Sequence, residues 1–217
     1  MSAAAPPPGP PPDARNATTL ATRRLELSFG TPADAALLFP YVHGEAGRAV
    51  TDTLLWDGPA GVDEIAAFFR LHTEGTWVPH GFHWLLRDRT GALAGYAGAP
   101  LGSIGVRPTD VPHRCDVGYW LAPPLWGRGL MTEALGAVCA HAFDALDMAK
   151  VEATVFPENT RGLALPPRVG FRREGLLRAH CVKRGRLQDV VLFGLLRDEL
   201  LRDAPGPTRA QRGRARQ

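Results

Sequence analysis

A glycine-rich turn between a strand-like segment and a helix-like segment is the part of this chain best suited to hold a ligand. Residues 115–121 are rich in aromatic and apolar side chains, as strands are, and two prolines without backbone donors follow soon after. Gly127 and Gly129 then allow a tight turn with no Cβ between backbone and ligand, and a helix is expected from about residue 129 to 146. The free N–H groups of its first turn and the positive end of its dipole predict a seat for a phosphate or pyrophosphate.

Two glycines between a strand and a helix also occur where the chain merely turns, so the surrounding residues decide what this turn is for. The segment is not a Walker loop, because Gly-Lys-Ser/Thr does not close it, and not a dinucleotide fingerprint, because the third glycine is missing. The whole string Gly118–Ala134 resembles the acetyl-coenzyme A signature of the GNAT N-acetyltransferase superfamily, in the form of its RimJ/RimL-like (ribosomal-protein N-acetyltransferase-like) branch. A nucleotide or RNA binder is an alternative that rests on the turn and a basic tail alone.

The resemblance covers residues 22–198. Beyond the turn it continues at Val151-Glu152-Ala153 and at Asn159. It resumes at Gly170–Gly175, which is similar to the “GF-x-x-EG” corner of the family, and ends with Gly185–Leu195, which is similar to the closing strands. Several matches in the same order and at the right separations identify the chain as a member of this superfamily.

The resemblance implies direct transfer of the acetyl group of acetyl-coenzyme A to an amine that is bound at the same time. Backbone amides of Gly127–Thr132 would hold the pyrophosphate, and the pantetheine arm would enter a split between strand 115–121 and strand 151–156, pairing like an added strand. A free N–H near Leu121 or Ala122 would polarise the thioester carbonyl. The expected coenzyme-binding residues are Leu121, Ala122, Trp126, Gly127, Arg128, Gly129, Leu130, Met131, Thr132 and Asn159.

Some of these residues also have a purely structural interpretation. Asn159 matches the family asparagine that contacts the pantetheine arm, but asparagine is equally suited to cap a helix. Arg128 either pairs with a phosphate or is solvated, and Trp126 is expected to pack over the turn. Glu133 lies in the first turn of the helix, where a carboxylate is favourable in any case, and no chemistry is assigned to it.

The usual catalytic groups of the family are replaced in this chain. The serine proposed to protonate the leaving thiolate is Gly162 here, and the glutamate suggested as the base is Cys181. The candidate catalytic residues are therefore His180, Thr160 and Asp116, with Tyr119 and Cys181 as further substitutes nearby. His180 has an unperturbed pKa near neutrality, although an exposed strand histidine without a catalytic part is the competing interpretation.

The expected acceptor is an amine: a protein N-terminus, a ribosomal protein or a small molecule. Without the usual base, an α-amine is favoured over a lysine side chain, because its reference pKa is about 7.7–8.0 rather than about 10.4. The alternative is a catalytically weak GNAT-like module that binds coenzyme A as a sensor or interaction domain, which the changes at Gly162 and Cys181 would fit. The sequence does not fix the oligomeric state, and a homodimer is one of the alternatives.

The hydrophobic pattern predicts alternating strands and helices around the motif. Strands are expected at residues 24–29, 82–87, from 92 onward, 115–121 and 151–156, and helices at 31–42, 62–72, 129–146 and 159–168. A closing hairpin is expected around Lys183-Arg184-Gly185. The pairing of residues 98–114 is left open. The strand–helix–strand crossover favours a mixed sheet, and the resemblance implies an α/β (α+β) fold with a mostly antiparallel sheet, a splayed central strand pair and helices on both faces.

Composition restricts the setting of the protein. We expect a disordered Ala/Pro-rich tail at 1–20, an acetyltransferase domain at 21–202 and a basic disordered tail at 203–217. The net charge is only +3, so nucleic acid is a disfavoured partner, and no apolar run reaches membrane-spanning length. Three widely spaced cysteines and the lack of a secretory signal favour the cytoplasm, and no cysteine–histidine spacing indicates a metal.

Overall fold

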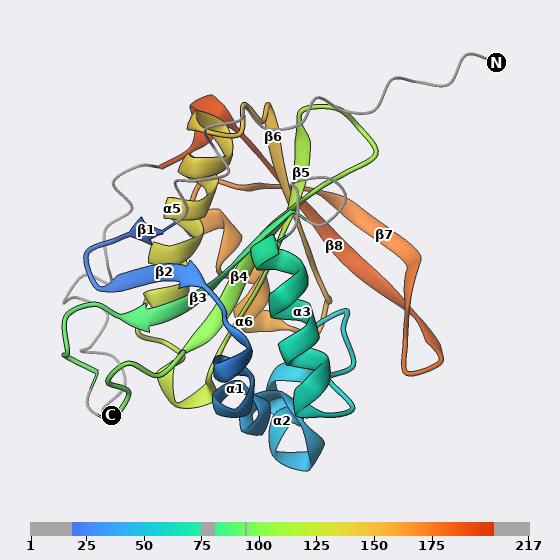
Figure 1. The fold of residues 1–217 in the computed structure, drawn as a ribbon. Helices are drawn as coiled ribbons and strands as arrows, with labels where there is room; N and C mark the ends of the chain where they lie inside the picture. The colour runs from blue at the N-terminus through green and yellow to red at the C-terminus, as the bar shows by residue number, and fades with distance from the viewer. Residues whose placement is uncertain (1–18, 75–80, 94, 202–217) are drawn as a thin grey trace, which may run out of the picture.

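The computed structural model describes residues 19–74, 81–93 and 95–201, whose path is shown in Figure 1. The tails expected at 1–20 and 203–217 fall outside these residues, apart from residues 19 and 20. Within the described parts, eight strands form one sheet in the order β1-β2-β3-β4-β5-β6-β8-β7. The strands are β1 (Leu20–Ala21), β2 (Leu25–Phe29), β3 (Phe82–Asp88), β4 (Gly102–Pro108), β5 (Arg114–Leu121), β6 (Lys150–Val155), β7 (Arg172–Lys183) and β8 (Arg186–Leu196).

Helices cover both faces of this sheet, which confirms the expected fold class (Figure 1). Helix α5 (Leu130–Asp144) lies along one face, while α1 (Ala35–Val42), α2 (Gly44–Thr51) and α3 (Val62–Glu74) gather on the other. Side chains alternate between the two faces along each strand, so Trp84 of β3 packs in the core with α5 and its neighbour Leu85 packs with α1 and α3. Shorter helical turns are Pro32–Asp34, Pro123–Leu125, α6 (Thr160–Leu163), Pro166–Arg168 and Arg197–Glu199.

Strands β5 and β6 run parallel, as the predicted crossover requires, and all other neighbours in the sheet are antiparallel. The parallel pairing is short: it joins Arg114–Asp116 to Lys150–Glu152 and then stops. Both strands continue, β5 paired with β4 as far as Leu121 and β6 paired with β8 as far as Val155. The sheet therefore opens between its two central strands, which is the splay that the family resemblance implies.

The closing hairpin is also confirmed. Arg184 and Gly185 both have positive φ, 47° and 74°, which is the geometry of a two-residue type I′ turn. The loop between α2 and α3 binds this hairpin turn, and we name the contact the clasp. Lys183 Nζ lies 2.7 Å from both the Trp56 carbonyl oxygen and Asp57 Oδ1, and Arg184 forms an ion pair with Asp52.

One expected element was wrong, and two elements, β4 and α2, were not predicted. Described residues from Ala92 to Pro100 form turns rather than a strand, and the strand lies instead at β4, within the region whose pairing the pattern left open. The glycines of this strand make it hard to recognise from sequence, because glycine is uncommon in strands. A Cβ at Gly102 would collide with the Trp120 carbonyl oxygen, so the glycine is needed for close approach of β4 and β5. Helix α2 was not predicted, since its sequence GEAGRAVT contains two poor helix formers.

Glu133 of α5 ties the first strands to the helix. Its Oε1 accepts hydrogen bonds from Thr22 Oγ1 at 2.6 Å and from the Arg24 backbone N–H at 2.7 Å, and its Oε2 accepts one from Arg24 Nε at 2.7 Å. Burial acts to raise the pKa of Glu133, but the hydrogen bonds from Thr22 and Arg24 and the charge of Arg24 outweigh it, so the pKa lies below its usual range. The structural interpretation of this carboxylate is thus the one that the geometry supports.

We predict that Glu133→Gln lowers the free energy of unfolding by about 1–3 kcal/mol at pH 7, because charge-assisted hydrogen bonds are lost. A depressed carboxyl pKa stabilises the fold above the pKa of the unfolded chain and loses this effect as the pH falls through the folded value. The difference between wild type and variant, measured by denaturant unfolding, should therefore shrink as the pH is lowered below about 4.3. A difference that does not change with pH would contradict this account.

Candidate active site where β5 and β6 diverge

The backbone of β5 presents an unpaired edge to the gap between β5 and β6. The Ala122 N–H donates to the Leu101 carbonyl oxygen at 2.8 Å, so this residue points its backbone groups toward β4. In an antiparallel ladder successive residues point to opposite sides, and the groups of Val117, Tyr119 and Leu121 therefore face the gap. Of the two N–H groups expected near the thioester, that of Leu121 faces the gap and that of Ala122 is used within the sheet.

The turn that follows has the conformation that its two glycines suggested. Gly127 and Gly129 have φ values of 74° and 73°, in the left-handed region that glycine adopts without strain, and Gly129 is the N-cap of α5. Trp126 packs over the turn as expected: its Nε1–H donates to the Leu121 carbonyl oxygen at 2.6 Å, and the Arg161 guanidinium stacks 4.7 Å from its ring centre.

A cavity of about 570 Å³ lies against this turn and the β5 edge, and we name it the turn cavity. All the expected coenzyme-binding residues line it except Ala122 and Arg128. The Arg128 side chain is exposed and its carbonyl oxygen accepts a hydrogen bond from Arg24 Nη1 at 3.0 Å, which supports the solvated interpretation of this arginine. Arg161 and Arg168 line the cavity and give it positive charge that the sequence motif did not indicate.

Asn159 and Gly162 form the wall of the turn cavity opposite the turn. Asn159 Oδ1 accepts a hydrogen bond from the Gly162 N–H at 2.9 Å, so the asparagine is the N-cap of α6, and its side chain also borders the cavity. The absence of a side chain at Gly162 is a packing requirement: a Cβ there would lie 2.5 Å from Asn159 Nδ2 and 2.8 Å from Val155 Cγ1. The change from the serine of the family is therefore accompanied by a tighter fit of the cap.

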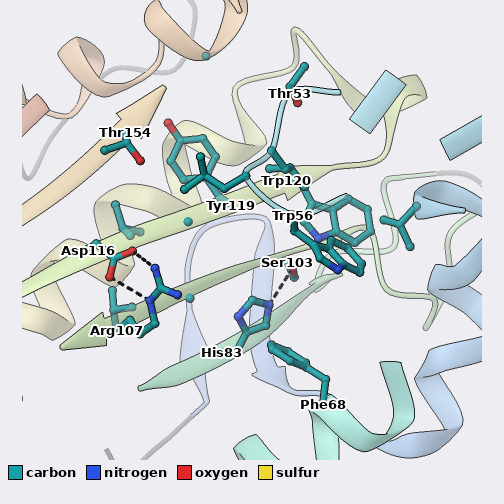
Figure 2. A pocket seen from close by; sticks show the side chains of 18 of the residues that line it. Thr53, Trp56, Phe68, His83, Ser103, Arg107, Asp116, Tyr119, Trp120 and Thr154 are labelled. Atoms are coloured by element: carbon teal, nitrogen blue, oxygen red, sulfur yellow. Dashed lines mark hydrogen bonds and ion pairs between the residues drawn. The ribbon is translucent and has the colours of Figure 1, made fainter. Parts of the chain in front are cut away.

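A second cavity of about 680 Å³ lies on the sheet face that α1 and α3 cover, and we name it the aromatic cavity. Thr53, Tyr119, Trp120, Asn159 and Gly162 line both cavities, which therefore meet at the β5 edge. Figure 2 shows the aromatic cavity, with the Phe68, Trp56 and Trp120 side chains around the His83–Ser103 pair and the Arg107–Asp116 pair farther along the sheet.

Two glycines shape the floor of the aromatic cavity. His83, Gly105 and Gly118 are direct partners across β3, β4 and β5 and share one face of the sheet. The imidazole lies over Gly105, because a Cβ at that position would collide with His83 Nδ1. A Cβ at Gly118 would have no heavy atom within 4 Å, so the floor is open between the imidazole and the β5 edge. His83 Nε2 lies 2.9 Å from Ser103 Oγ.

The structure does not bring the three candidate catalytic residues together. Asp116 lines the aromatic cavity, with its carboxylate in a two-pronged pair with Arg107 at 2.8 and 3.1 Å, whereas Thr160 lines the turn cavity. His180 is exposed beside the irregularity of β7 at Ala179 and borders neither cavity. Cys181, which takes the place of the family glutamate, is also outside both.

The histidine that the aromatic cavity contains, His83, was missed by the sequence analysis. It lies outside the recognised motifs, and the chain pattern around it is that of an ordinary strand. Its neighbours Phe82 and Trp84 point into the core on the α5 side, so alternation places His83 on the opposite face, but nothing in the sequence indicates that this face is hollow there.

Tyr119 is the titratable residue among those that line both cavities. Its hydroxyl is buried and has no hydrogen-bond partner within the described residues. Burial raises the pKa of Tyr119 well above its usual range, so the hydroxyl stays protonated near neutral pH.

Two further features are absent from the residues that the structure describes. No group of three His, Cys, Asp or Glu residues lies close enough to hold a metal ion. No described helix is both long and apolar enough to cross a membrane.

The model of the acetyltransferase (GNAT) domain matches residues 24–172, which is most of the chain. The chain belongs to the GNAT acetyltransferase family. It is 37% identical over 100 residues to N-acetyltransferase p20 of Bacillus licheniformis, a protein named as uncharacterised, in a match that covers 46% of this chain and 56% of that protein. It is 32% identical over 83 residues to the ribosomal protein uS5-alanine N-acetyltransferase of Escherichia coli, covering 38% and 43%. The chain thus spans about half the length of these relatives.

Solved GNAT structures share the fold at low sequence identity. RimJ of Mycobacterium smegmatis, solved in complex with CoA-disulfide, superimposes with a TM-score of 0.69 over 88% of this chain and 92% of its own, at 23% identity. At that identity the likeness concerns the fold, and it confirms the predicted mixed, mostly antiparallel sheet with helices.

We predict that restoring the family serine, Gly162→Ser, destabilises this chain by about 1–3 kcal/mol without raising activity, because the new Cβ crowds Asn159 and Val155. Thermal unfolding and thiol release from acetyl-coenzyme A would measure the two effects. Gly136→Ser is the matched control, since a Cβ at that glycine of α5 meets nothing within 4 Å. A stable and faster Gly162→Ser variant would show that the site accepts a hydroxyl there.

Proposed function

We propose that this protein transfers the acetyl group of acetyl-coenzyme A directly to a primary amine. The observation that carries the proposal is the unpaired β5 edge, which ends at a glycine turn and separates two cavities of different character. Backbone groups that are neither paired nor solvated are costly, so an edge of this kind favours a ligand that supplies the missing partners. The amides of a pantetheine arm are suited to this, because they pair with a strand edge as an added strand does.

The turn cavity is the proposed coenzyme side. Backbone N–H groups of residues 127–132 surround the N-terminus of α5, where the dipole favours a pyrophosphate, and Arg161 and Arg168 add positive charge. The Leu121 N–H, which faces the gap, is the proposed donor to the oxygen of the thioester carbonyl. A fixed donor aimed at developing negative charge is typically worth about 10²–10³ in rate.

The aromatic cavity is the proposed amine side, since it opens onto the same edge from the other face. The relative named for an alanine of ribosomal protein uS5 supports a protein acceptor, and such an acceptor would place the reaction in the cytoplasm. An incoming amine must lose a proton before or during attack, and this requires an acceptor group within reach.

His83 is the proposed proton acceptor, in place of His180. The imidazole lies over Gly105, and the bare Gly118 leaves the space between the ring and the β5 edge open. Ser103 holds Nε2 and so fixes the orientation of the ring, while the edge that bears Nδ1 lies over Gly105. An ordered water could extend its reach across Gly118. An imidazole has an unperturbed pKa near neutrality, which suits a base that must act near pH 7.

We predict that Gly129→Val abolishes detectable binding of acetyl-coenzyme A. The φ of 73° disfavours a β-branched residue by roughly 1–2 kcal/mol, and the added side chain would stand where the backbone must meet a phosphate. Isothermal calorimetry would measure affinity, and circular dichroism would verify that the variant is folded. Gly136→Val in the same helix should bind like wild type. Equal affinities for the two variants would refute the assignment of the turn.

We predict that His83→Gln lowers kcat by about 10²–10⁴-fold, the usual contribution of a positioned proton acceptor, and leaves the affinity for acetyl-coenzyme A unchanged. The variant should also lose the acid limb of the pH–rate profile, which a purely structural histidine would not affect. His180→Gln is the matched control and should change kcat less than twofold. A larger loss at His180 than at His83 would restore the original candidate.

A further inference from the structure

The aromatic cavity leaves large apolar side chains in contact with solvent. Leu55, Trp56 and Phe68 line it and are 46%, 39% and 37% exposed. Leu55 and Trp56 come from the α2–α3 loop, which Lys183 joins to the hairpin turn, and Phe68 comes from α3. Apolar surface that is gathered around a cavity and left open favours a ligand that covers it.

The carboxylates around the aromatic cavity already have hydrogen-bond or ion-pair partners. Its carboxylates within the described residues are Glu64 and Asp116, and each is engaged. Glu64 accepts a hydrogen bond from the Ala60 N–H at 2.8 Å, and Asp116 is held by both nitrogen donors of Arg107. The neighbouring carboxylates Asp52 and Asp57 are paired with the cations of the hairpin turn. Among these carboxylates only Glu64 has no cation as its partner within the described residues, so a ligand with several positive charges would find a single carboxylate here to pair with.

The floor of the aromatic cavity is suited to a bulky flat group. Gly105 and Gly118 leave the sheet bare between His83 and the β5 edge, with Trp120 on the same face of the sheet. The volume of about 680 Å³ is within the range of sites that take drug-sized ligands and exceeds what a small side chain such as alanine would fill. Aromatic walls around such a floor favour stacked or edge-on ring contacts.

We propose that the acceptor is a primary amine carried on one large apolar or aromatic group with no second positive charge. The inference rests on the proposed function and names the substrate class for the same site. The apolar group packs against Trp56 and Phe68 above the glycine floor, and the amine points to the β5 edge. Both a free aralkyl amine and a peptide whose first residue is large and apolar have this chemistry.

The test compares amines by thiol release from acetyl-coenzyme A, and its central pair is matched in reactivity. Phenylalaninamide and glycinamide both present an α-amine, so their difference reports the apolar group. We expect kcat/KM to be at least about tenfold higher for phenylalaninamide, since each buried methylene alone is worth about 10–200-fold in discrimination. Spermidine, which carries several charges, should be the poorest substrate. A peptide beginning with phenylalanine and free 2-phenylethylamine then distinguish the two sources of the amine.

A cavity-filling variant connects this preference to the proposed floor. Gly118→Leu has room for its Cβ, so the fold should persist while the side chain occupies the place of the acceptor group. The preference for phenylalaninamide over glycinamide should fall at least about fivefold, and the affinity for acetyl-coenzyme A should not change. Gly136→Leu, on α5 and outside both cavities, is the matched control. Should Gly118→Leu fail to fold, Phe68→Ala tests the wall in the same way.

The possible outcomes distinguish a failure of the proposed substrate class from a failure of the proposed acetyltransferase function. Faster turnover of glycinamide or spermidine than of phenylalaninamide would overturn the substrate class and leave the acetyltransferase standing. An unchanged preference in Gly118→Leu and in Phe68→Ala would overturn the location. Thiol release from none of the amines, with acetyl-coenzyme A still bound in calorimetry, would overturn the proposed function itself.

Discussion

The backbone of β5 beyond Asp116 has hydrogen-bonding groups on one side that no strand of the described sheet pairs, although the Leu121 carbonyl oxygen accepts the Trp126 Nε1–H. The parallel ladder to β6 lasts for three residues, after which each strand keeps its outer neighbour and loses its inner one. A buried and unpaired strand edge is normally avoided, because each unmet N–H or C=O carries a desolvation cost. Here the edge lies in a gap bordered by two cavities, so the cost is offset once an extended ligand pairs with it. The site therefore depends on main-chain geometry more than on any side chain.

The two faces of the sheet have different roles: one contains the continuous core and the other contains the aromatic cavity. The α5 face contains the continuous core, including the buried Leu135, Val138 and Val151, and it supports the turn that begins the helix. The opposite face is interrupted by Gly105 and Gly118, and the layer of α1–α3 leaves a hollow over them. Changes to side chains in the hollow can alter what is bound there without disturbing the core, because the two sets of residues point in opposite directions.

Sequence alone predicted the parts in which local chemistry is decisive. The turn at Gly127 and Gly129, helix α5 and the hairpin at Arg184-Gly185 follow from glycine conformation, proline punctuation and apolar spacing. It gave no answer where tertiary packing overrides composition: the glycines and prolines of residues 98–114 left the pairing of β4 open, although Gly102 and Gly105 allow strands and side chains to approach closely. It also failed for His83, because a hollow over the sheet is produced by residues distant in the chain. His180, chosen for its residue type and its place in the motif, proved to lie on the exposed side of β7.

The clasp between the hairpin turn and the α2–α3 loop joins parts of the chain that are 127 residues apart. Lys183 is almost fully buried in this contact, although its turn is otherwise at the surface. During synthesis the amino-terminal helices leave the ribosome long before the hairpin exists. The wall that holds Trp56 can therefore reach its final position only after β7 and β8 have been made. A newly made chain therefore acquires the geometry of its aromatic cavity as one of the last events of folding.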